Sequence, residues 1–357
     1  MNRRTILAAA AIAALPLGAA AQDVSFEGQQ IEFWVPFSEG GGTDVWARSL
    51  APFLSEHLPG NPDLVVVNNT QGGGIGGTNE FHRRMEPDGT MILGTSGSIQ
   101  IPFLLRDPRV RYDYADFVPV FASPAGGVVY VRSDSGIADA SEIGELAGTG
   151  AMYGSQGVAT LDLVPLLAFE LLGLEVEAVF GMASRSDAMQ SIQRGELQID
   201  YQTTPSYISG VQPLVEEGEM TPLFAWGALD AEGEIVRDPT FPDLPSFPEV
   251  YEMVHGEAPS GPAWDAWKAF YASGFGVQKF VMLPEGTDEG IVEAYRGAFA
   301  DMVADAEAMG TLEGEIGSYE QITGDALIPA KAAATEVAPE TEEWVLTWLE
   351  ERYGFTQ

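Results

Sequence analysis

Hydrophobic and polar residues along this chain follow two alternating patterns. Short apolar runs, such as "IEFWV" (31–35) and the valine-rich "LVVVN" (64–68), are typical of strands buried in a sheet. In other stretches, such as 44–58, apolar residues recur every three or four positions, which predicts an amphipathic helix with one face on the core. The same criteria predict strands at 91–94, 128–131, 151–155, 176–180, 197–201, 222–226 and 280–284, and helices near 77–86, 161–172, 186–194, 288–305 and 339–352.

Strands that alternate with helices every 25 to 35 residues or so indicate parallel α/β sheets. Two such runs, 30–122 and 124–222, predict two doubly wound units, and the remainder is expected to return to the first unit. We therefore expect one domain made of residues 22–122 plus 227–357 and a second made of residues 123–226. Two chain crossings would then join the domains, with a cleft between them.

The first 21 residues have the pattern of a secretory signal peptide. Arg3 and Arg4 form a basic start, an apolar stretch follows to Leu17, and "AAA" (19–21) supplies a cleavage site. A membrane anchor fits less well because the apolar run is shorter than the ~20 residues that a span requires. We expect cleavage near Ala21 and export to the periplasm, by either the general or the twin-arginine route.

Composition excludes several classes of function. The chain has 53 Asp and Glu against 17 Lys and Arg, for a formal net charge of −36, and it has no cysteine. An acidic surface of this kind repels nucleic acid and anionic lipid, so we expect neither as a partner. The acids could bind cations or could form a solvated surface suited to salt; none has the spacing of a calcium loop. Without cysteine the chain has no thiol nucleophile or thiolate metal ligand, and we expect no metal, no cofactor and a monomeric protein.

Two glycine-rich loops are the main candidates for binding chemistry. Pro36 ends the first strand and Gly40–Gly42 follow, after which Thr43 or Asp44 is expected to cap a helix. The second strand leads into "NNTQGGGIGG" (68–77) and another helix. Loops at the carboxyl ends of adjacent parallel strands are where α/β folds hold ligands, and helix N-termini there present free N–H groups that suit an anion.

The nature of that anion is constrained by what the loops lack. No lysine follows either loop, so the phosphate-binding P-loop pattern is absent. "GGGIGG" is a loose relative of the dinucleotide fingerprint, but the region about 20 positions on is the turn "EPDGTM". The glycines could also serve turns alone. Two loops of one kind, each between a strand and a helix, favour a carboxylate held by main-chain N–H groups.

Taken in order, the motifs of this chain resemble a known family. "VPFSEGGGTDVWARSLAPFLSEHL", "VVVNNTQGGGIGG" and "MEPDGTMILG" resemble the substrate-binding proteins of tripartite tricarboxylate transporters, the Bug or TctC type. The resemblance covers nearly the whole mature chain through "DFVPV" (116–120), "YGSQGVAT" (153–160), "GELQIDYQTTPS" (195–206) and "FPDLPSFPEV" (241–250).

The resemblance implies a fold, a function and partners. The fold would be the type II periplasmic-binding-protein fold, with two doubly wound α/β domains and a hinged cleft. The function would be capture of a small di- or tricarboxylate or related organic acid, and its delivery to the membrane subunits of a tripartite tricarboxylate-type transporter, without insertion into the membrane. A sensor role, in which the loaded protein docks on a two-component kinase, shares the same residues and stays open, and so does an exported hydrolase.

The family's contact loops correspond here to residues 38–44, 72–77, 95–96 and 155–160. Departures from the family pattern fall at Gln202, at "MAS" (182–184), which precedes Arg185, and at Leu163. Arg185 would either pair a second carboxylate or simply flank a helix and bond a surface acid. The predicted ligand-binding residues are Phe37, Ser38, Gly41, Gly42, Thr43, Asp44, Gly73, Gly74, Gly76, Thr95, Ser96, Ser155, Gln156, Gly157, Thr160, Arg185 and Gln202.

Residues suited to catalysis are scarce. The three histidines, His57, His82 and His255, accompany no G-x-S-x-G elbow and no H-E-x-x-H motif. No two carboxylates stand out as a glycosidase pair. Trp264 and Trp267 could stack on a ring, but helical spacing favours packing. We therefore expect a binding protein with no catalytic residues.

Overall fold

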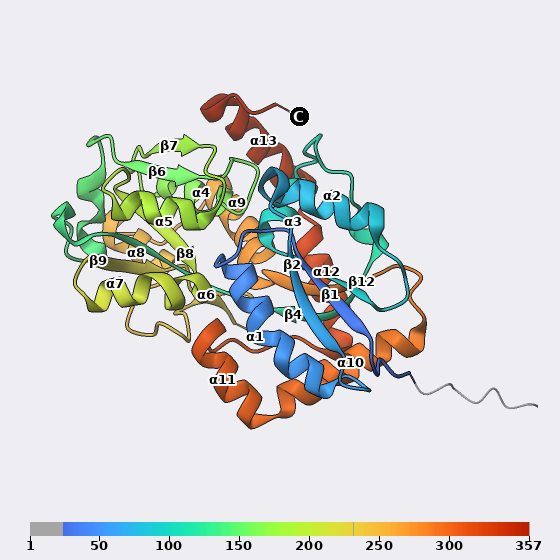
Figure 1. Ribbon diagram of the computed structural model, residues 1–357. Helices are drawn as coiled ribbons and strands as arrows, with labels where there is room; N and C mark the ends of the chain where they lie inside the picture. The colour runs from blue at the N-terminus through green and yellow to red at the C-terminus, as the bar shows by residue number, and fades with distance from the viewer. Residues whose placement is uncertain (1–23, 231, 357) are drawn as a thin grey trace, which may run out of the picture.

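The computed structural model describes residues 24–230 and 232–356, and shows two α/β lobes (Figure 1). The predicted signal peptide lies outside the described residues. Each lobe is built on one five-stranded sheet, which confirms the prediction of two α/β units. The described helices include none with both the length and the apolar character of a membrane span.

The first sheet has the strand order β2-β1-β3-β12-β4. Strands β1, β2 and β3 run parallel, so their carboxyl ends, and the loops that follow them, meet at one edge. Strand β12 is antiparallel to both of its neighbours. The bounds are β1 (Gln30–Val35), β2 (Asp63–Asn68), β3 (Met91–Gly94), β4 (Phe117–Ser123) and β12 (Lys279–Pro284).

The second sheet has the order β7-β6-β8-β5-β9, and β5 is antiparallel to β8 and β9. Strands β6 and β7 run parallel. A separate two-stranded hairpin, β10 (Ala228–Leu229) and β11 (Ile235–Val236), follows. The bounds are β5 (Gly127–Arg132), β6 (Met152–Ser155), β7 (Glu177–Phe180), β8 (Ile199–Thr203) and β9 (Met220–Ala225).

Helices cover both sheets, and their apolar faces fill the cores. In α1, Trp46, Leu50 and Leu54 are fully buried, as the spacing predicted, while Phe53 is half-buried. The α-helices are α1 (Gly42–His57), α2 (Ile75–Arg84), α3 (Gly97–Leu104), α4 (Leu163–Leu171), α5 (Arg185–Gln193), α6 (Thr204–Ser206), α7 (Gln212–Glu216), α8 (Phe247–His255), α9 (Pro262–Tyr271), α10 (Glu289–Ala304), α11 (Ala306–Ile316), α12 (Leu327–Thr335) and α13 (Pro339–Tyr353).

Short helical turns complete the structure. Seven are described: η1 (Gln71–Gly74), η2 (Tyr114–Asp116), η3 (Ser133–Ser135), η4 (Ala140–Leu146), η5 (Tyr207–Val211), η6 (Ala272–Gly276) and η7 (Gly324–Ala326).

Three expectations about the sheets are corrected. Both sheets are mixed, not wholly parallel, because β12 and β5 enter them in the opposite direction. Strand β2 is an edge strand whose residues are mostly half-buried, although its valines suggested full burial. Strand β4 and helix α3 were not predicted; β4 contains Pro119, and α3 is buried on nearly all sides, so neither has a periodic pattern.

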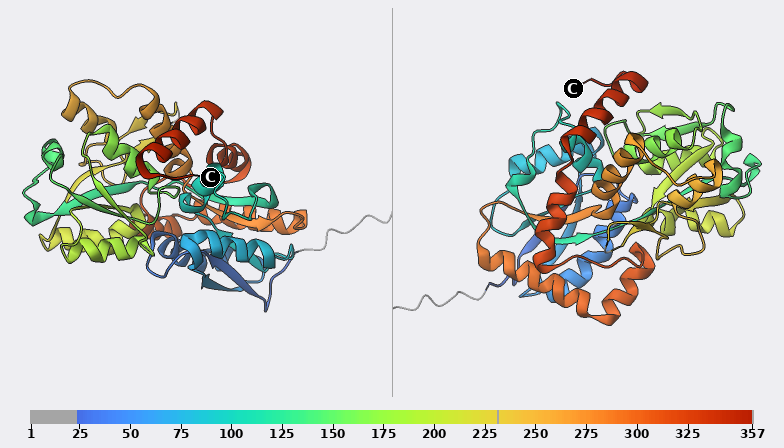
Figure 2. Two further views of the ribbon diagram at one scale, coloured as in Figure 1. Left: turned by 90° about the horizontal axis from the view of Figure 1, so that it is seen from above. Right: turned by 180° about the vertical axis from the view of Figure 1, so that it is seen from behind.

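The packing of the C-terminal third bears on where the domains divide. Helices α8, α9 and α13 bury Phe247, Trp267 and Leu349 in one cluster with second-sheet residues such as Tyr201. Figure 2 shows α13 beside α9. The division at residues 122/123 and 226/227 stays a prediction, and this packing argues for adding those three helices to the second lobe.

Candidate functional site

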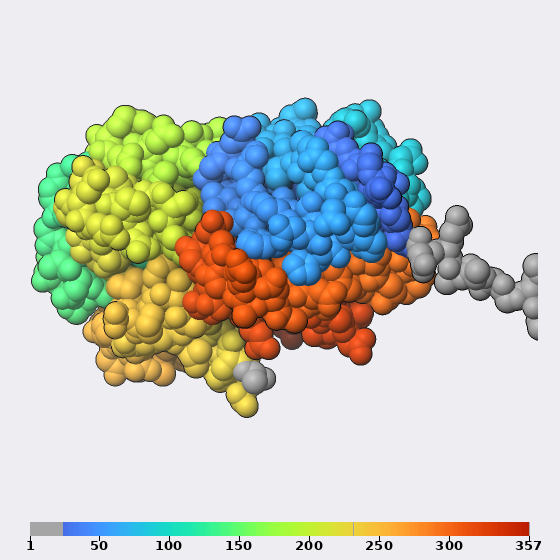
Figure 3. Space-filling view, turned by 60° about the horizontal axis from the view of Figure 1, so that its bottom comes forward, coloured from blue at the N-terminus to red at the C-terminus, as the bar shows by residue number. Residues whose placement is uncertain are grey.

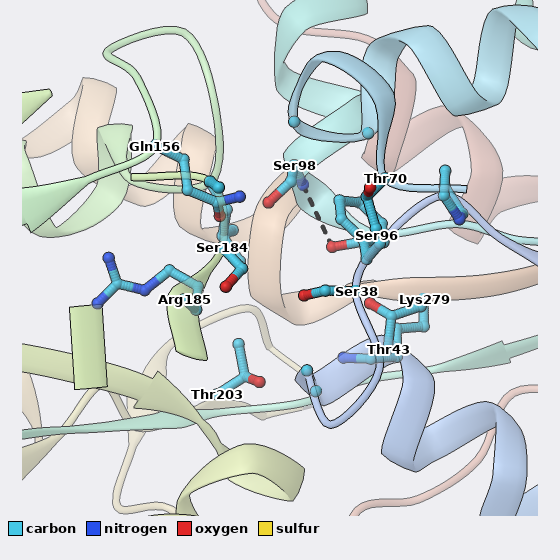
Figure 4. A pocket seen from close by; sticks show the side chains of 18 of the residues that line it. Ser38, Thr43, Thr70, Ser96, Ser98, Gln156, Ser184, Arg185, Thr203 and Lys279 are labelled. Carbon is cyan, nitrogen blue, oxygen red and sulfur yellow. Dashed lines mark hydrogen bonds between the residues drawn. The ribbon is translucent and has the colours of Figure 1, made fainter. Parts of the chain in front are cut away.

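A cavity of about 50 Å³ lies between the two lobes, at the carboxyl ends of β1, β2 and β3 (Figure 4). One water needs roughly 10–15 Å³ on the same measure, so there is room for a small solute. Figure 3 shows the lobes in contact along one face, with α11 against their boundary. The lining residues are Pro36, Phe37, Ser38, Gly41, Gly42, Thr43, Thr70, Gly73, Gly74, Ser96, Ser98, Gln156, Leu161, Ala183, Ser184, Arg185, Thr203, Gln278 and Lys279.

The first glycine loop leads into α1 and brings main-chain donors to the cavity. Gly41 is the N-cap, and the amides of Gly42 and Thr43, in the first turn, have no hydrogen-bond acceptor among the described residues. The expected cap is wrong: neither Thr43 nor Asp44 caps the helix, since both lie inside it. Asp44 does not line the cavity; its carboxylate accepts from the Gly40 N–H and from Arg48.

The second glycine loop forms the turn η1 and the start of α2. Gly72, Gly73 and Gly74 have φ of 60°, 66° and 102°, a region that favours glycine, so the loop needs these residues for its shape as well as for close approach. Gly73 and Gly74 line the cavity, as predicted. Gly76 does not line it, because it is the second residue of α2 and packs against Gln71.

A third helix N-terminus completes this wall. Ser96 caps α3, and its Oγ accepts from the Ser98 N–H at 3.3 Å. Ser96 lines the cavity as predicted, and Ser98 lines it as well. Thr95 does not, because its buried hydroxyl accepts from the Phe280 N–H at 3.0 Å and so joins β3 to β12.

On the second lobe, the loop 155–162 is held by one buried carboxylate. Asp162 accepts from the Ser155 hydroxyl at 3.0 Å, the Gln156 N–H at 2.6 Å and the Tyr201 hydroxyl at 3.1 Å. Only Gln156 of the four predicted residues in this loop lines the cavity. The other three form hydrogen bonds within the loop. The Ser155 hydroxyl donates to Asp162, the Gly157 N–H donates to the Ser155 hydroxyl, and the Thr160 hydroxyl donates to the Gly157 carbonyl.

Arg185 lines the cavity, but both terminal nitrogens of its guanidinium are already bonded, while its buried Nε has no partner among the described residues. Arg185 pairs with buried Asp200 and donates to the carbonyls of Gly154 at 2.6 Å and Tyr201 at 2.8 Å. Figure 4 shows the guanidinium pointing away from the glycine loops. The arrangement does not support bidentate pairing with a ligand. Neither alternative considered for Arg185 fits, since its partner is a buried acid of β8.

Gln202 also supports the wall without lining it. Its side-chain amide is fully buried and donates to the Arg185 carbonyl at 2.9 Å and to Asp200 at 3.1 Å. The departure from the family pattern at this position therefore changes the support beneath the site.

Sequence reasoning missed Gln278 and Lys279. Lys279 begins β12 and is 1% exposed, and burial lowers its pKa to about 7. Both polar atoms of the buried Gln278 amide, and the Ser38 hydroxyl, have no hydrogen-bond partner among the described residues. The signal was visible as two polar residues at the start of an apolar strand, "QKFVML". The other missed lining residues are Pro36, Thr70, Ser98, Leu161, Ala183, Ser184 and Thr203.

The cavity lining differs in composition from the acidic chain as a whole. Although the chain has 53 acidic residues, no Asp or Glu is among the described residues that line the cavity, while Arg185 and Lys279 both do. An anion there meets N–H groups and cations within a protein whose global field repels it. The local chemistry therefore suits a small anion.

The side chains considered for other roles lie elsewhere. The imidazoles of His57 and His255 bond main-chain carbonyls, and that of His82 bonds Asp116 at 2.8 Å. Trp267 is buried and stacks on Trp264 with ring centroids 5.1 Å apart, as packing predicted.

The two lobes with a polar cavity between them have the fold of periplasmic binding proteins. Solved structures share this fold across most of their length. An R. palustris protein, Rpa4515, with adipate is 21% identical with a TM-score of 0.69, covering 91% of this chain and 97% of that one. MatC from Rhodopseudomonas palustris with bound malate is 17% identical with a TM-score of 0.61, covering 90% and 97%.

Curated relatives are similar in sequence, although no protein-family model matches the chain. A UPF0065 protein of Pseudomonas sp. (strain P51) is 31% identical over 146 residues, 40% of this chain and 42% of that one, so the chain matches less than half of that relative. A UPF0065 protein of Cupriavidus necator is 27% identical over 84% of each chain. BugT of Bordetella pertussis is 34% identical over 34% of this chain and 37% of its own. The resemblance to the Bug/TctC family that the ordered motifs predicted is confirmed, since the chain is similar in sequence to these UPF0065 and Bug proteins.

Proposed function

We propose that this protein is an exported solute-binding protein that holds a small organic carboxylate between its lobes and releases it unaltered. One observation carries the proposal: in a chain with net charge −36, the described lining of the interlobe cavity has no acid, and it has a lysine without a described partner and free helix-start amides. Donors of this kind bind anions without a metal. That Rpa4515 was solved with adipate and MatC with malate is consistent with this ligand class.

The proposed binding cycle is closure of two lobes about their connecting segments. Domain 1 (22–122 plus 227–357) presents the glycine loops, and domain 2 (123–226) covers them. Closure requires contacts that exist only in the closed form. The Gly42–Thr203 approach is one candidate, since a Cβ at Gly42 would overlap the Thr203 hydroxyl. Delivery to the membrane subunits of a tripartite tricarboxylate-type transporter, in the periplasm and after signal cleavage, completes the proposal.

A thermal-shift screen tests the ligand class. Purified protein, first stripped of bound solute by partial unfolding and dialysis, is tested against mono-, di- and tricarboxylates, sugars, nucleotides and neutral amino acids. We expect the melting temperature to rise with one or more carboxylates, because a ligand that binds only the folded state stabilises it. Shifts with sugars or nucleotides and none with carboxylates would overturn the proposal.

A second measurement separates binding from catalysis. The ligand is incubated with protein, released by denaturation and compared with the starting material by NMR. We expect identical spectra; a new species that grows with incubation time would make the protein an enzyme.

A further inference from the structure

Lys279 occupies a position that a lysine rarely takes. The chain has only three lysines, and the other two have acceptors: Lys268 lies 3.7 Å from Asp265, and Lys331 donates to the Phe117 carbonyl at 2.7 Å. Lys279 is 1% exposed, lines the interlobe cavity, and has no hydrogen bond or ion pair from its ammonium to any described residue. Buried ammonium groups are costly and are normally paired.

Two further polar side chains share that cavity and also have no partner. The Ser38 hydroxyl and the Gln278 amide are both buried, and no described residue bonds their polar atoms. Buried polar groups in native proteins are nearly always bonded, so Lys279, Ser38 and Gln278, unpartnered on one wall of the cavity, point to a common partner within it. Figure 4 shows Ser38 and Lys279 on the same side of the pocket, with Thr43.

Resting on the proposed carboxylate function, we propose that Lys279, Ser38 and Gln278 form a side-chain clamp in which the Lys279 ammonium pairs with one ligand carboxylate. The glycine-loop amides would then share the ligand with an ion pair. A carboxylate accepts up to about four hydrogen bonds, so an ammonium, a hydroxyl and an amide N–H can bond one carboxylate together.

The charged side chains described around Lys279 are already paired with other residues, so a ligand carboxylate is the partner proposed for its ammonium. Arg185 is the other charged side chain among the described lining residues, and its guanidinium is held by Asp200. The carboxylate of Asp44, in the first turn of α1, is bonded by Arg48 and by Asn68 at 2.9 Å. On the neighbouring strands, Lys279 pairs with Ser123 of β4, and the residues of β3 that pair with β12, Leu93 and Gly94, are uncharged.

Burial alone lowers the pKa of Lys279 to about 7, which gives binding a proton signature. Above pH 7 the lysine of the free protein is mostly neutral, whereas a bound carboxylate favours its charged form. Binding therefore takes up one proton, and affinity falls by up to tenfold per pH unit above 7.

Lysine NMR combined with calorimetry tests the clamp. Protein labelled at lysine Cε and Nζ is expected to give three resonances, one of which is absent from K279M, titrates near pH 7 and shifts when the best carboxylate of the screen is added. We expect K279M to bind that carboxylate at least about 100-fold more weakly at pH 6.5, with K268M unchanged. Calorimetry at pH 8.5 in two buffers of different ionisation heat is expected to show uptake of about one proton by wild type and none by K279M.

The outcomes separate the two proposals. If wild type binds no carboxylate, the proposed function fails. If wild type binds and a folded K279M, checked by circular dichroism, has the same affinity and pH profile, the function stands and the clamp is wrong. Should K279M not fold, the clamp is tested by the affinity of K279Q and by whether the affinity of wild type falls above pH 7. A flat wild-type profile and an unmoved Lys279 resonance would overturn the clamp.

Discussion

The two walls of the cavity differ in how their polar groups are used. On the first lobe, Ser38 and Gln278 have buried polar atoms without a described partner, buried Lys279 has no described acceptor, and α1 starts with free amides. On the second lobe, Ser155 and Arg185 are bonded to their own buried carboxylates, Asp162 and Asp200. The first wall has donors available for a ligand. On the second wall, most donors already bond other groups of the same lobe.

This difference indicates separate tasks for the two lobes. Free donors in a buried site are worth most to a ligand that replaces water there. A wall held by its own ion pairs keeps its shape while the other lobe moves. We therefore expect substitutions in the first wall to change affinity and those in the second to change stability.

The largest effect on stability is expected from Arg185→Met. The change leaves Asp200 buried without its cation, and Asp200 is 0% exposed. Breaking one partner of a buried pair costs about 3–5 kcal/mol. Urea unfolding followed by circular dichroism measures it.

Arg194→Met is the matched control for that change. Arg194 is the C-cap of α5, at the opposite end from Arg185; it is half-exposed and pairs with exposed Glu196. Its loss should cost less than about 1 kcal/mol. Equal losses in the two variants would contradict the structural role of the second wall.

The second effect, on the first wall, has the opposite sign. Lys279→Met removes a buried amine whose pKa is lowered to about 7 from an ordinary value near 10.5, so we expect the ligand-free variant to be more stable than wild type, by on the order of a few kcal/mol at pH 6–7.

The pH dependence of that gain identifies its cause. Between pH 7 and about 10 the unfolded wild type binds a proton that the folded one lacks, so its stability rises with pH and the gain of the variant shrinks. Urea midpoints at pH 6.5 and 9 for wild type, Lys279→Met and the half-exposed control Lys268→Met measure this. A destabilised Lys279→Met protein at pH 6.5 would mean that the lysine has a partner after all.

The third effect concerns the contact between the walls. Gly42→Ala places a methyl group against the Thr203 hydroxyl and should weaken ligand binding by about tenfold, since overpacking costs about 1–3 kcal/mol. The double variant with Thr203→Gly removes the obstruction and should regain affinity. Calorimetry of both variants tests closure. If the double variant does not regain affinity, the affinity lost in Gly42→Ala comes from a change within the loop and not from contact with Thr203.

The parts of the fold with strong local signals were predictable. Strands β1 and β3 and helix α1 lie within two residues of their expected ranges, because Pro36 and the glycines mark their limits and apolar spacing is regular. The reversed direction of β12 was not predictable, because strand direction depends on partners far away in sequence.

Separation in sequence also explains which residues of the site were predicted and which were missed. The glycine loops were found because each follows its strand directly in sequence. Gln278 and Lys279 come from a strand more than 200 residues later, and its place between β3 and β4 follows only from the assembled sheet. Arg185 was expected at the cavity, but its acid, Asp200, comes from the neighbouring strand β8, and local spacing did not indicate that pairing.

The smallest effects come from a matched pair of serines, and they test the comparison most directly. Ser38 follows the end of β1 and Ser155 is the last residue of β6; the Ser38 hydroxyl has no described partner, whereas Ser155 bonds Asp162. Ser38→Ala should lower ligand affinity by about five- to tenfold with little change in unfolding free energy. Ser155→Ala should lower that free energy by about 1–2 kcal/mol, because it takes a hydrogen bond from a buried carboxylate, and should leave affinity within about twofold. Calorimetry and urea unfolding of both variants give four numbers. The reversed pattern, with affinity lost in Ser155→Ala and stability lost in Ser38→Ala, would show that the second lobe grips the ligand and the first supports it.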